Sequence, residues 1–218
     1  MVLIQFDPRF IEIEYELWAL GHLRTVIEEQ IAFLRAQDTL KTYAELKEQG
    51  WYHDEGERQL ASQELDERQD YVIPRFFRGP FVVSLWASYE SAVVEVAGYL
   101  GRHSGAALAL HDIRARSELK QFRKYFDAVL KRPLDESKER LEWIEDIRVI
   151  RHALAHANGQ QRAIPDDKWR LVSEVLTRRG RPPDEYRGVV ILSETFVREA
   201  YEAVNSSLRD LVVRARSA

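Results

Sequence analysis

One permanently charged side chain and two titratable ones stand together late in the chain, at Arg151, His152 and His156. Arginine offers a planar donor fork that matches phosphate oxygens, and histidine takes up and returns a proton near neutral pH. RNA carries its own nucleophile, the ribose 2′-hydroxyl. If an imidazole takes the proton of that hydroxyl while a guanidinium stabilises charge on the phosphorus oxygens, strand scission needs neither a metal nor a protein nucleophile.

The element that must position these side chains is predicted to be an amphipathic helix over about residues 136–157. At about 100° per residue, Arg148, His152 and His156 fall on one line, so both histidines are expected to point outward. Asn158-Gly159 is typical of a left-handed helix stop. The apolar stripe on the other side recurs at spacings of four, three and four: Trp143, Ile147, Ile150 and Leu154.

Arg151 and His156 are about 140° apart on that helix, yet a guanidinium on its long stem reaches across one turn. One helix can therefore offer a fixed cation and a titratable imidazole to one ligand. The alternative interpretation is a solvated face on which cations near the helix C-terminus are favoured by the helix dipole.

The pattern of an arginine, a polar residue, three further residues and a histidine on a late helix resembles the motif of the HEPN superfamily. In that superfamily the motif carries metal-independent RNase activity. His152 fills the polar slot, and the trailing Asn158-Gly159 is also similar to many members. The resemblance covers roughly residues 81–159. The toxin subgroup whose motif continues with His-x-Tyr has tyrosine where this chain has Asn158, so regulation through modification of that tyrosine is not expected.

The resemblance implies a dimer whose two motif helices face each other across one composite RNA site. In the implied roles His156 is the acid and base, Arg151 binds and stabilises the phosphate, and His152 orients RNA or supports His156. Arg148 and Asn158 are further candidates for contact with the substrate. HEPN-like domains often place an acidic residue on an earlier helix near the motif, which makes Glu90 a candidate partner of Arg151 or His156. The alternative for Glu90 is an ordinary surface or helix-packing carboxylate.

A basic concentration precedes the motif helix between residues 114 and 140, and it includes Lys120, Arg123 and Lys124. Such a run is the best candidate for a surface that follows RNA phosphates, although acidic residues dilute it and a solvated face is the alternative. Ser117 is expected to cap the helix that carries these three side chains.

The chain is expected to be all-α, with an N-terminal helical extension over residues 1–78 and a HEPN-type helical bundle over 79–218. A long helix is predicted near the start, followed by a polar stretch of short or exposed helices from Asp38 to Asp70. Gly79-Pro80 favours a helix that begins at about residue 81. Residues 168–176 fit either a helix or a strand, with a small β-hairpin near 168–192 as one outcome, and Ser193 is expected to cap the final helix.

Composition limits the function classes. The 218 residues carry a formal net charge of −4, which is unlike a sequence-independent nucleic-acid coat, so any RNA contact must be local. Cysteine is absent, which excludes disulfides and thiolate metal sites and is compatible with a reducing cytosol. No stretch is long enough to span a membrane, and residues 1–8 do not resemble a signal peptide, so we expect a cytoplasmic protein without a membrane partner.

The function expected from these observations is that of a metal-independent endoribonuclease that needs no cofactor and acts on RNA as a homodimer. Similarity to the HEPN superfamily implies a setting such as a toxin or an antiphage-defence effector, with a cognate antitoxin or other regulatory protein as a further partner. The alternative is a non-catalytic helical module that binds protein or RNA through the same face.

Overall fold

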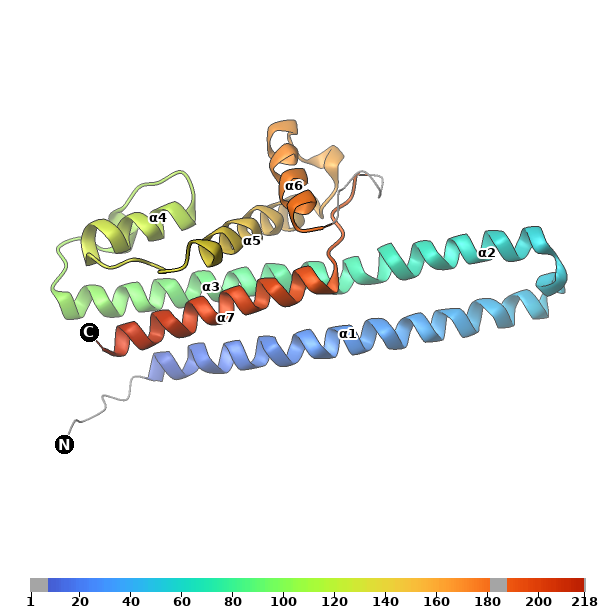
Figure 1. The fold of residues 1–218 in the computed structure, drawn as a ribbon, viewed down its shortest axis with the longest axis horizontal. Coiled ribbons are helices and arrows are strands. Elements are labelled where there is room, and N and C mark those ends of the chain that lie inside the picture. Colours follow the sequence, from blue (N-terminus) through green and yellow to red (C-terminus); the bar gives the residue numbers. More distant parts are fainter. Residues whose placement is uncertain (1–7, 181–187, 218) are drawn as a thin grey trace. The chain divides into compact units, whose positions relative to one another are not determined.

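A computed structural model describes residues 8–180 and 188–217, and all regular structure in this part of the chain is helical. The all-α expectation is therefore confirmed for the described residues. Figure 1 shows the helices in chain order. They are α1 (Pro8–Glu48), α2 (Glu55–Glu67), α3 (Ile73–Ser104), α4 (Glu118–Tyr125), α5 (Lys138–Ala157), α6 (Asp166–Arg178) and α7 (Glu194–Arg216).

The chain divides into two compact units, and four long helices pass from one unit into the other. The first unit comprises residues 1–21, 84–148 and 199–218, and the second comprises residues 22–83 and 149–198. Each unit therefore draws on segments that are distant in sequence, so neither one is a continuous stretch of chain.

The first unit contains a buried polar cluster around Asp135, whose side chain is fully inaccessible to solvent. Arg140 donates to it at 2.8 Å and also reaches Asp210 at 2.6 Å. Burial by itself raises the pKa of Asp135, but hydrogen bonds from Arg140, Ser207 and the Ser137 backbone outweigh it and hold that pKa below its usual value. The carboxylate thus ties the loop before α5 to α5 itself.

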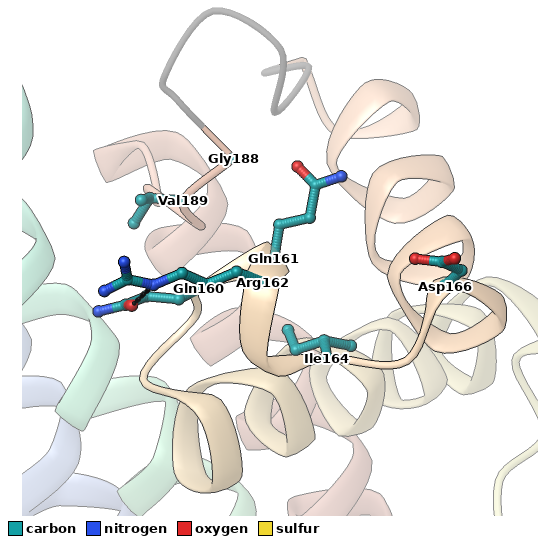
Figure 2. Close-up of a pocket in the computed structure, with 7 residues that line it drawn as sticks. All are labelled: Gln160, Gln161, Arg162, Ile164, Asp166, Gly188 and Val189. Carbon is teal, nitrogen blue, oxygen red and sulfur yellow. Dashed lines mark hydrogen bonds between the residues drawn. The ribbon is translucent and has the colours of Figure 1, made fainter.

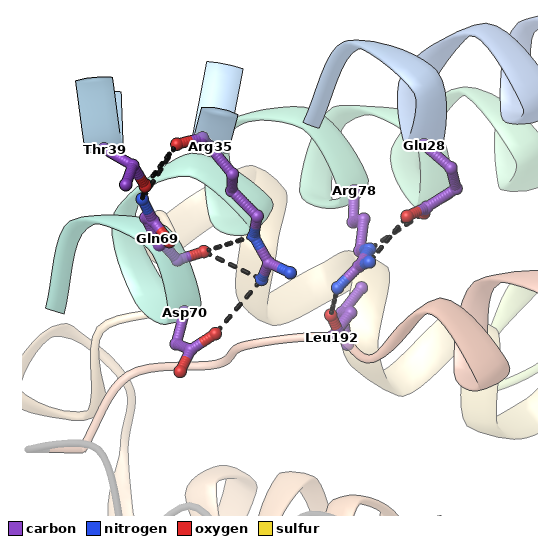
Figure 3. A network of polar contacts seen from close by, with 7 residues as sticks. All are labelled: Glu28, Arg35, Thr39, Gln69, Asp70, Arg78 and Leu192. Carbon is purple, nitrogen blue, oxygen red and sulfur yellow. Dashed lines mark hydrogen bonds and ion pairs between the residues drawn. The ribbon is translucent and has the colours of Figure 1, made fainter. Parts of the chain in front are cut away.

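The second unit is built around an antiparallel pair formed by the later part of α1 and by α2 with the start of α3 (Figure 1). Arg35 on α1 donates to the Gln69 carbonyl and to Asp70, as Figure 3 shows. In the same unit Arg78, whose side chain is only 9% exposed, donates to Glu28 at 2.6 Å and to the Leu192 carbonyl at 3.1 Å (Figure 3). This buried ion pair joins α1, α3 and the segment before α7.

The predicted start of a helix at about residue 81 was wrong. α3 begins at Ile73 and contains Pro80, and a π-helical turn at Arg68–Val72 joins it directly to α2. A proline ring clashes with the carbonyl four residues earlier, and a widened turn before Pro74 accommodates such a ring. Pro80 therefore lies inside α3 and does not mark a helix boundary.

The first helix was also underestimated, because α1 continues through the polar stretch to Glu48. Its polar residues face solvent there, while Thr42 and Leu46 stay buried against the rest of the second unit. The polar stretch is broken after α1 by a left-handed Gly50 (φ 76°) and a short 3₁₀ turn over Trp51–His53.

The structure does not support a β-hairpin near residues 168–192. Residues 166–178 form α6, and the described residues around 189 make a single antiparallel bridge, between Gln160 and Val189. Part of the predicted hairpin, residues 181–187, lies outside the described residues. The α6 sequence buries Trp169, Val172, Val175 and Leu176 at helical spacing, which decides between helix and strand.

The predicted start of the final helix is confirmed. The Ser193 hydroxyl accepts a hydrogen bond from the Phe196 backbone N–H at 3.1 Å, so it caps α7. The apolar face of α7 is buried, and its residues Phe196, Ala200, Ala203 and Leu211 are 7% exposed or less.

Candidate functional site

The helix that carries the motif ends as its sequence predicts. Asn158 (φ 47°) and Gly159 (φ 67°) are both left-handed, and the Gly159 N–H donates to the Ala153 carbonyl at 3.0 Å. This six-to-one hydrogen bond is the signature of a Schellman C-cap. The predicted apolar stripe also holds: Trp143, Ile147 and Ile150 are buried and Leu154 is half-buried.

Close packing surrounds this helix end in the second unit. A Cβ on Gly159 would lie 3.0 Å from the Val190 Cβ and 3.2 Å from a Leu154 methyl group. On the other side, a Cβ on Gly79 of α3 would lie 3.6 Å from Leu154. The end of α5 is therefore fixed between α3 and the segment that leads into α7.

Arg75 is a residue at this helix end that sequence reasoning missed. Its guanidinium donates to the Asn158 backbone carbonyl at 2.6 Å, across 83 positions of sequence. A cation that binds a C-terminal carbonyl also complements the negative end of the helix dipole. No local sequence signal marks Arg75, because its partner lies 83 positions away.

The structure brings the two histidines of the motif together. The rings of His152 and His156 lie 4.5 Å apart between centroids, tilted by 52°. His156 is exposed, as predicted, whereas His152 and Arg151 are half-buried, so the expectation that both histidines point freely outward holds for His156 alone. The reason is spacing: residues four apart stack on one helix face, and His152 lies one turn nearer the packed body of α5.

Arg148, predicted to contact the substrate, already binds a carboxylate of the first unit. Its guanidinium makes a paired contact with Glu145, at 3.0 Å from Nε and 2.7 Å from Nη2. The hydrogen bond that Arg148 donates to Glu145 is the main cause that raises the pKa of Arg148, and the Glu118 charge adds to it. A phosphate would have to compete with this carboxylate, so Arg148 is a weaker candidate than its sequence position suggested.

The basic residues Lys120, Arg123 and Lys124 are all exposed on α4 of the first unit. Ser117 caps this helix as predicted, accepting from the Lys120 backbone N–H at 3.4 Å. A π-helical turn at Phe126–Leu130 then adds one residue to the helical repeat, and it leaves Leu130 buried and Val129 half-buried. The three basic side chains remain a predicted phosphate-following surface.

Glu90 has a described partner in the first unit: it accepts a hydrogen bond from the Trp86 indole at 3.0 Å. Trp86 is buried and Glu90 is half-buried. This contact fits the helix-packing alternative for Glu90. Its predicted support of Arg151 or His156 stays a prediction.

A pocket of 570 Å³ lies directly after the motif helix in the second unit (Figure 2). Its lining is mostly polar, and Arg162 donates to the Gln160 side chain within it at 2.9 Å. The volume falls in the range of small-molecule sites. Sequence reasoning missed this pocket, because it forms where the turn after α5 meets residues that precede α7. The lining residues are Gln160, Gln161, Arg162, Ile164, Asp166, Gly188 and Val189.

Among residues 8–180 and 188–217, no three His, Asp or Glu side chains come together as metal ligands would. No helix in that part of the chain has a long enough apolar run to cross a lipid bilayer.

Comparison with family models, with curated proteins and with solved structures gives no match to this chain. What is known of its site is therefore the geometry of its own residues.

Proposed function

We propose that this protein is a metal-independent endoribonuclease of HEPN type, acting as a homodimer at a composite site and serving as a toxin or antiphage-defence effector. The observation that carries the proposal is the geometry at the end of α5. An exposed imidazole, His156, lies 4.5 Å from a second imidazole, His152, with Arg151 beside them in sequence and a rigid cap immediately after. This arrangement supports the proposed roles of His156 as proton carrier and of Arg151 as phosphate-binding cation on one helix end.

The proposed reaction is an internal displacement at phosphorus. His156 takes the proton of the ribose 2′-hydroxyl, the 2′-oxygen forms a bond to phosphorus, and the bond from phosphorus to the 5′-oxygen breaks. The leaving 5′-oxygen receives a proton from the partner's His156 across the dimer. Arg151 stabilises the charge on the non-bridging oxygens. The products are a 2′,3′-cyclic phosphate and a 5′-hydroxyl.

The pocket after the helix supports an RNA substrate. Gln160 and Gln161 offer amide groups that both donate and accept, and Asp166 offers an acceptor, which suits the edge of an unpaired base. The pocket follows Gly159 directly in sequence, and its proposed role is to hold a nucleotide next to the cleaved linkage. A cognate antitoxin or other regulatory protein is then expected to act by covering this helix end.

The test is incubation of the purified full-length protein with end-labelled RNA in excess chelator. Cleavage that leaves 2′,3′-cyclic phosphate ends, and that is lost in His156→Ala and in Arg151→Ala, supports the proposal. The matched control is His111→Ala, because the side chain of His111 is 86% exposed in a loop of the first unit. RNA methylated at the 2′-oxygens must resist cleavage.

The rival function is a non-catalytic helical module that binds RNA or protein through the same face. Tight RNA binding by the folded protein, with no cleavage at any enzyme concentration, would favour this module and overturn the nuclease proposal. Equal cleavage by the wild type and His156→Ala would point to a contaminating nuclease.

A further inference from the structure

Helix α1 is apolar on two opposite faces, and the rest of the second unit covers only one of them. Ile27, Ile31 and Leu46 are buried against the second unit. On the opposite face Phe33 is 55% exposed and Leu40 is 70% exposed. A helix that is apolar on both sides normally has both sides covered, so this exposed face indicates an interaction surface.

The exposed face follows a regular spacing. At about 100° per residue its members lie about 120–180° from the centre of the buried face. Alternating spacings of four and three are the repeat of a coiled-coil seam. We call it the outer seam, and its residues, all exposed, are Glu29, Phe33, Ala36, Leu40, Tyr43 and Lys47.

We propose that two copies of this chain pair antiparallel through the outer seam. The two-fold axis crosses the seam at the level of position 38 along the helix. In this register Leu40 packs on the partner's Ala36, and Phe33 packs on the partner's Tyr43. Glu29 meets the partner's Lys47 at each end. The proposal concerns α1 and does not rest on the nuclease activity proposed above.

The residue types in the seam favour a second copy in this orientation. The two central layers set a large side chain against a small one, which is how facing helices interdigitate. The aromatic layers then match Phe33 with Tyr43, an arrangement that edge-to-face packing stabilises. Every seam position thus finds a suitable partner in the same six residues, as an isologous interface requires.

The charges exclude the parallel alternative. A parallel pair would place Glu29 on the partner's Glu29 and Lys47 on the partner's Lys47, and like charges in a helix seam are repulsive. The antiparallel pair makes two attractive contacts in their place. The seam spans about 27 Å of helix, so the contact is at the small end of specific interfaces and the dimer is expected to dissociate on dilution.

The first test is sedimentation of the full-length protein at about 100 μM and below. The wild type is expected to form a larger assembly than Leu40→Glu at the same concentration, and the difference is expected to vanish on dilution. Leu171→Glu is the matched control, because Leu171 is 47% exposed on α6. A Leu40→Glu variant with the same assembly state as the wild type at every concentration overturns the proposal.

The second test uses two exposed charges whose replacement leaves the core intact. Glu29→Lys alone and Lys47→Glu alone are expected to weaken the dimer at least tenfold. An equimolar mixture of the two variants, or the double variant, is expected to restore it, because opposite charges then meet again. A dimer that is insensitive to these exchanges, or a mixture that fails to recover, overturns the antiparallel register.

Cross-linking reports the orientation directly, because the chain has no native cysteine. In the proposed pair Gln37→Cys lies next to the partner's position 37 and forms an intermolecular disulfide. Lys47→Cys lies far from its own copy and does not. A parallel pair gives the reverse result. A different protein as the occupant of the seam gives neither disulfide. Either outcome overturns the proposal.

Discussion

The imidazole rings of His152 and His156 lie 4.5 Å apart on successive turns of α5, where His156 is exposed and His152 is half-buried. Two rings in such contact differ in their access to a ligand, because His152 also faces the packed body of the helix. This difference in exposure is in keeping with the different roles proposed for the two histidines.

The same substitution at the two histidines should separate these roles. His152→Asn keeps a polar side chain at a position that supports its neighbour, so RNA cleavage is expected to fall by no more than about tenfold. His156→Asn removes the proton carrier and is expected to lower cleavage by about 100-fold or more, as loss of general acid–base catalysis does. Single-turnover cleavage rates with excess enzyme measure both. Equal losses in the two variants would contradict this assignment.

The basic side chains of α4 should set the salt dependence of RNA binding. Replacing Lys120, Arg123 and Lys124 together by glutamine is expected to reduce the slope of log binding constant against log salt by about two for single-stranded RNA. Arg148→Gln is the control and should leave that slope unchanged, because Glu145 already holds the Arg148 guanidinium. Fluorescence anisotropy at a series of salt concentrations gives the slopes. An unchanged slope in the triple variant would remove these residues from the RNA surface.

Gly159 should tolerate no side chain. Gly159→Ala requires a left-handed alanine and also sets a Cβ 3.0 Å from Val190. The free energy of unfolding is therefore expected to fall by about 2–4 kcal/mol. Gly50→Ala is the control for backbone strain alone, because Gly50 is also left-handed and an added Cβ there would meet nothing within 4 Å. The free energy of unfolding of this control is expected to fall by about 1 kcal/mol. Urea denaturation of the two variants measures the difference, and similar values would show that packing at Gly159 is looser than described.

The buried pair of Arg78 and Glu28 should be sensitive to loss of one partner. Arg78→Met leaves Glu28 and the Leu192 carbonyl without this donor. The free energy of unfolding is therefore expected to fall by about 3–5 kcal/mol. Arg78→Met combined with Glu28→Met should be less destabilised than Arg78→Met alone, because no carboxylate then remains buried. Denaturant unfolding of the two variants tests this ordering, and the reverse order would show that Glu28 is solvated without Arg78.

Asp135 should make stability depend on pH in the acid range. Its pKa is lower in the folded protein than in the unfolded chain, so its stabilising contribution is complete above about pH 4, the ordinary carboxyl pKa. The contribution is lost as pH falls through the lower, folded pKa. Asp135→Asn is expected to lower stability by about 1–3 kcal/mol at neutral pH and to flatten the curve below pH 4. Thermal unfolding across pH, with the exposed Asp127→Asn as control, checks this. Parallel curves for the wild type and Asp135→Asn would contradict it.

The sequence by itself determined the elements whose signals are local. The stripe of α5, its left-handed stop at Asn158 and Gly159, and the serine caps at Ser117 and Ser193 could all be predicted. Each depends on residues within one or two turns of one another, where helix periodicity and cap chemistry act.

The tertiary structure decided what depends on distant partners. Arg75 reaches Asn158 across 83 positions, and Arg78 reaches Leu192 across 114, so no local pattern marks either contact. The continuation of α3 through Pro80 is likewise a tertiary outcome, because packing of the buried residues around it outweighs the local cost of a proline. Short-range rules place chemical groups on a helix, but burial against other segments decides which of those groups a ligand can reach.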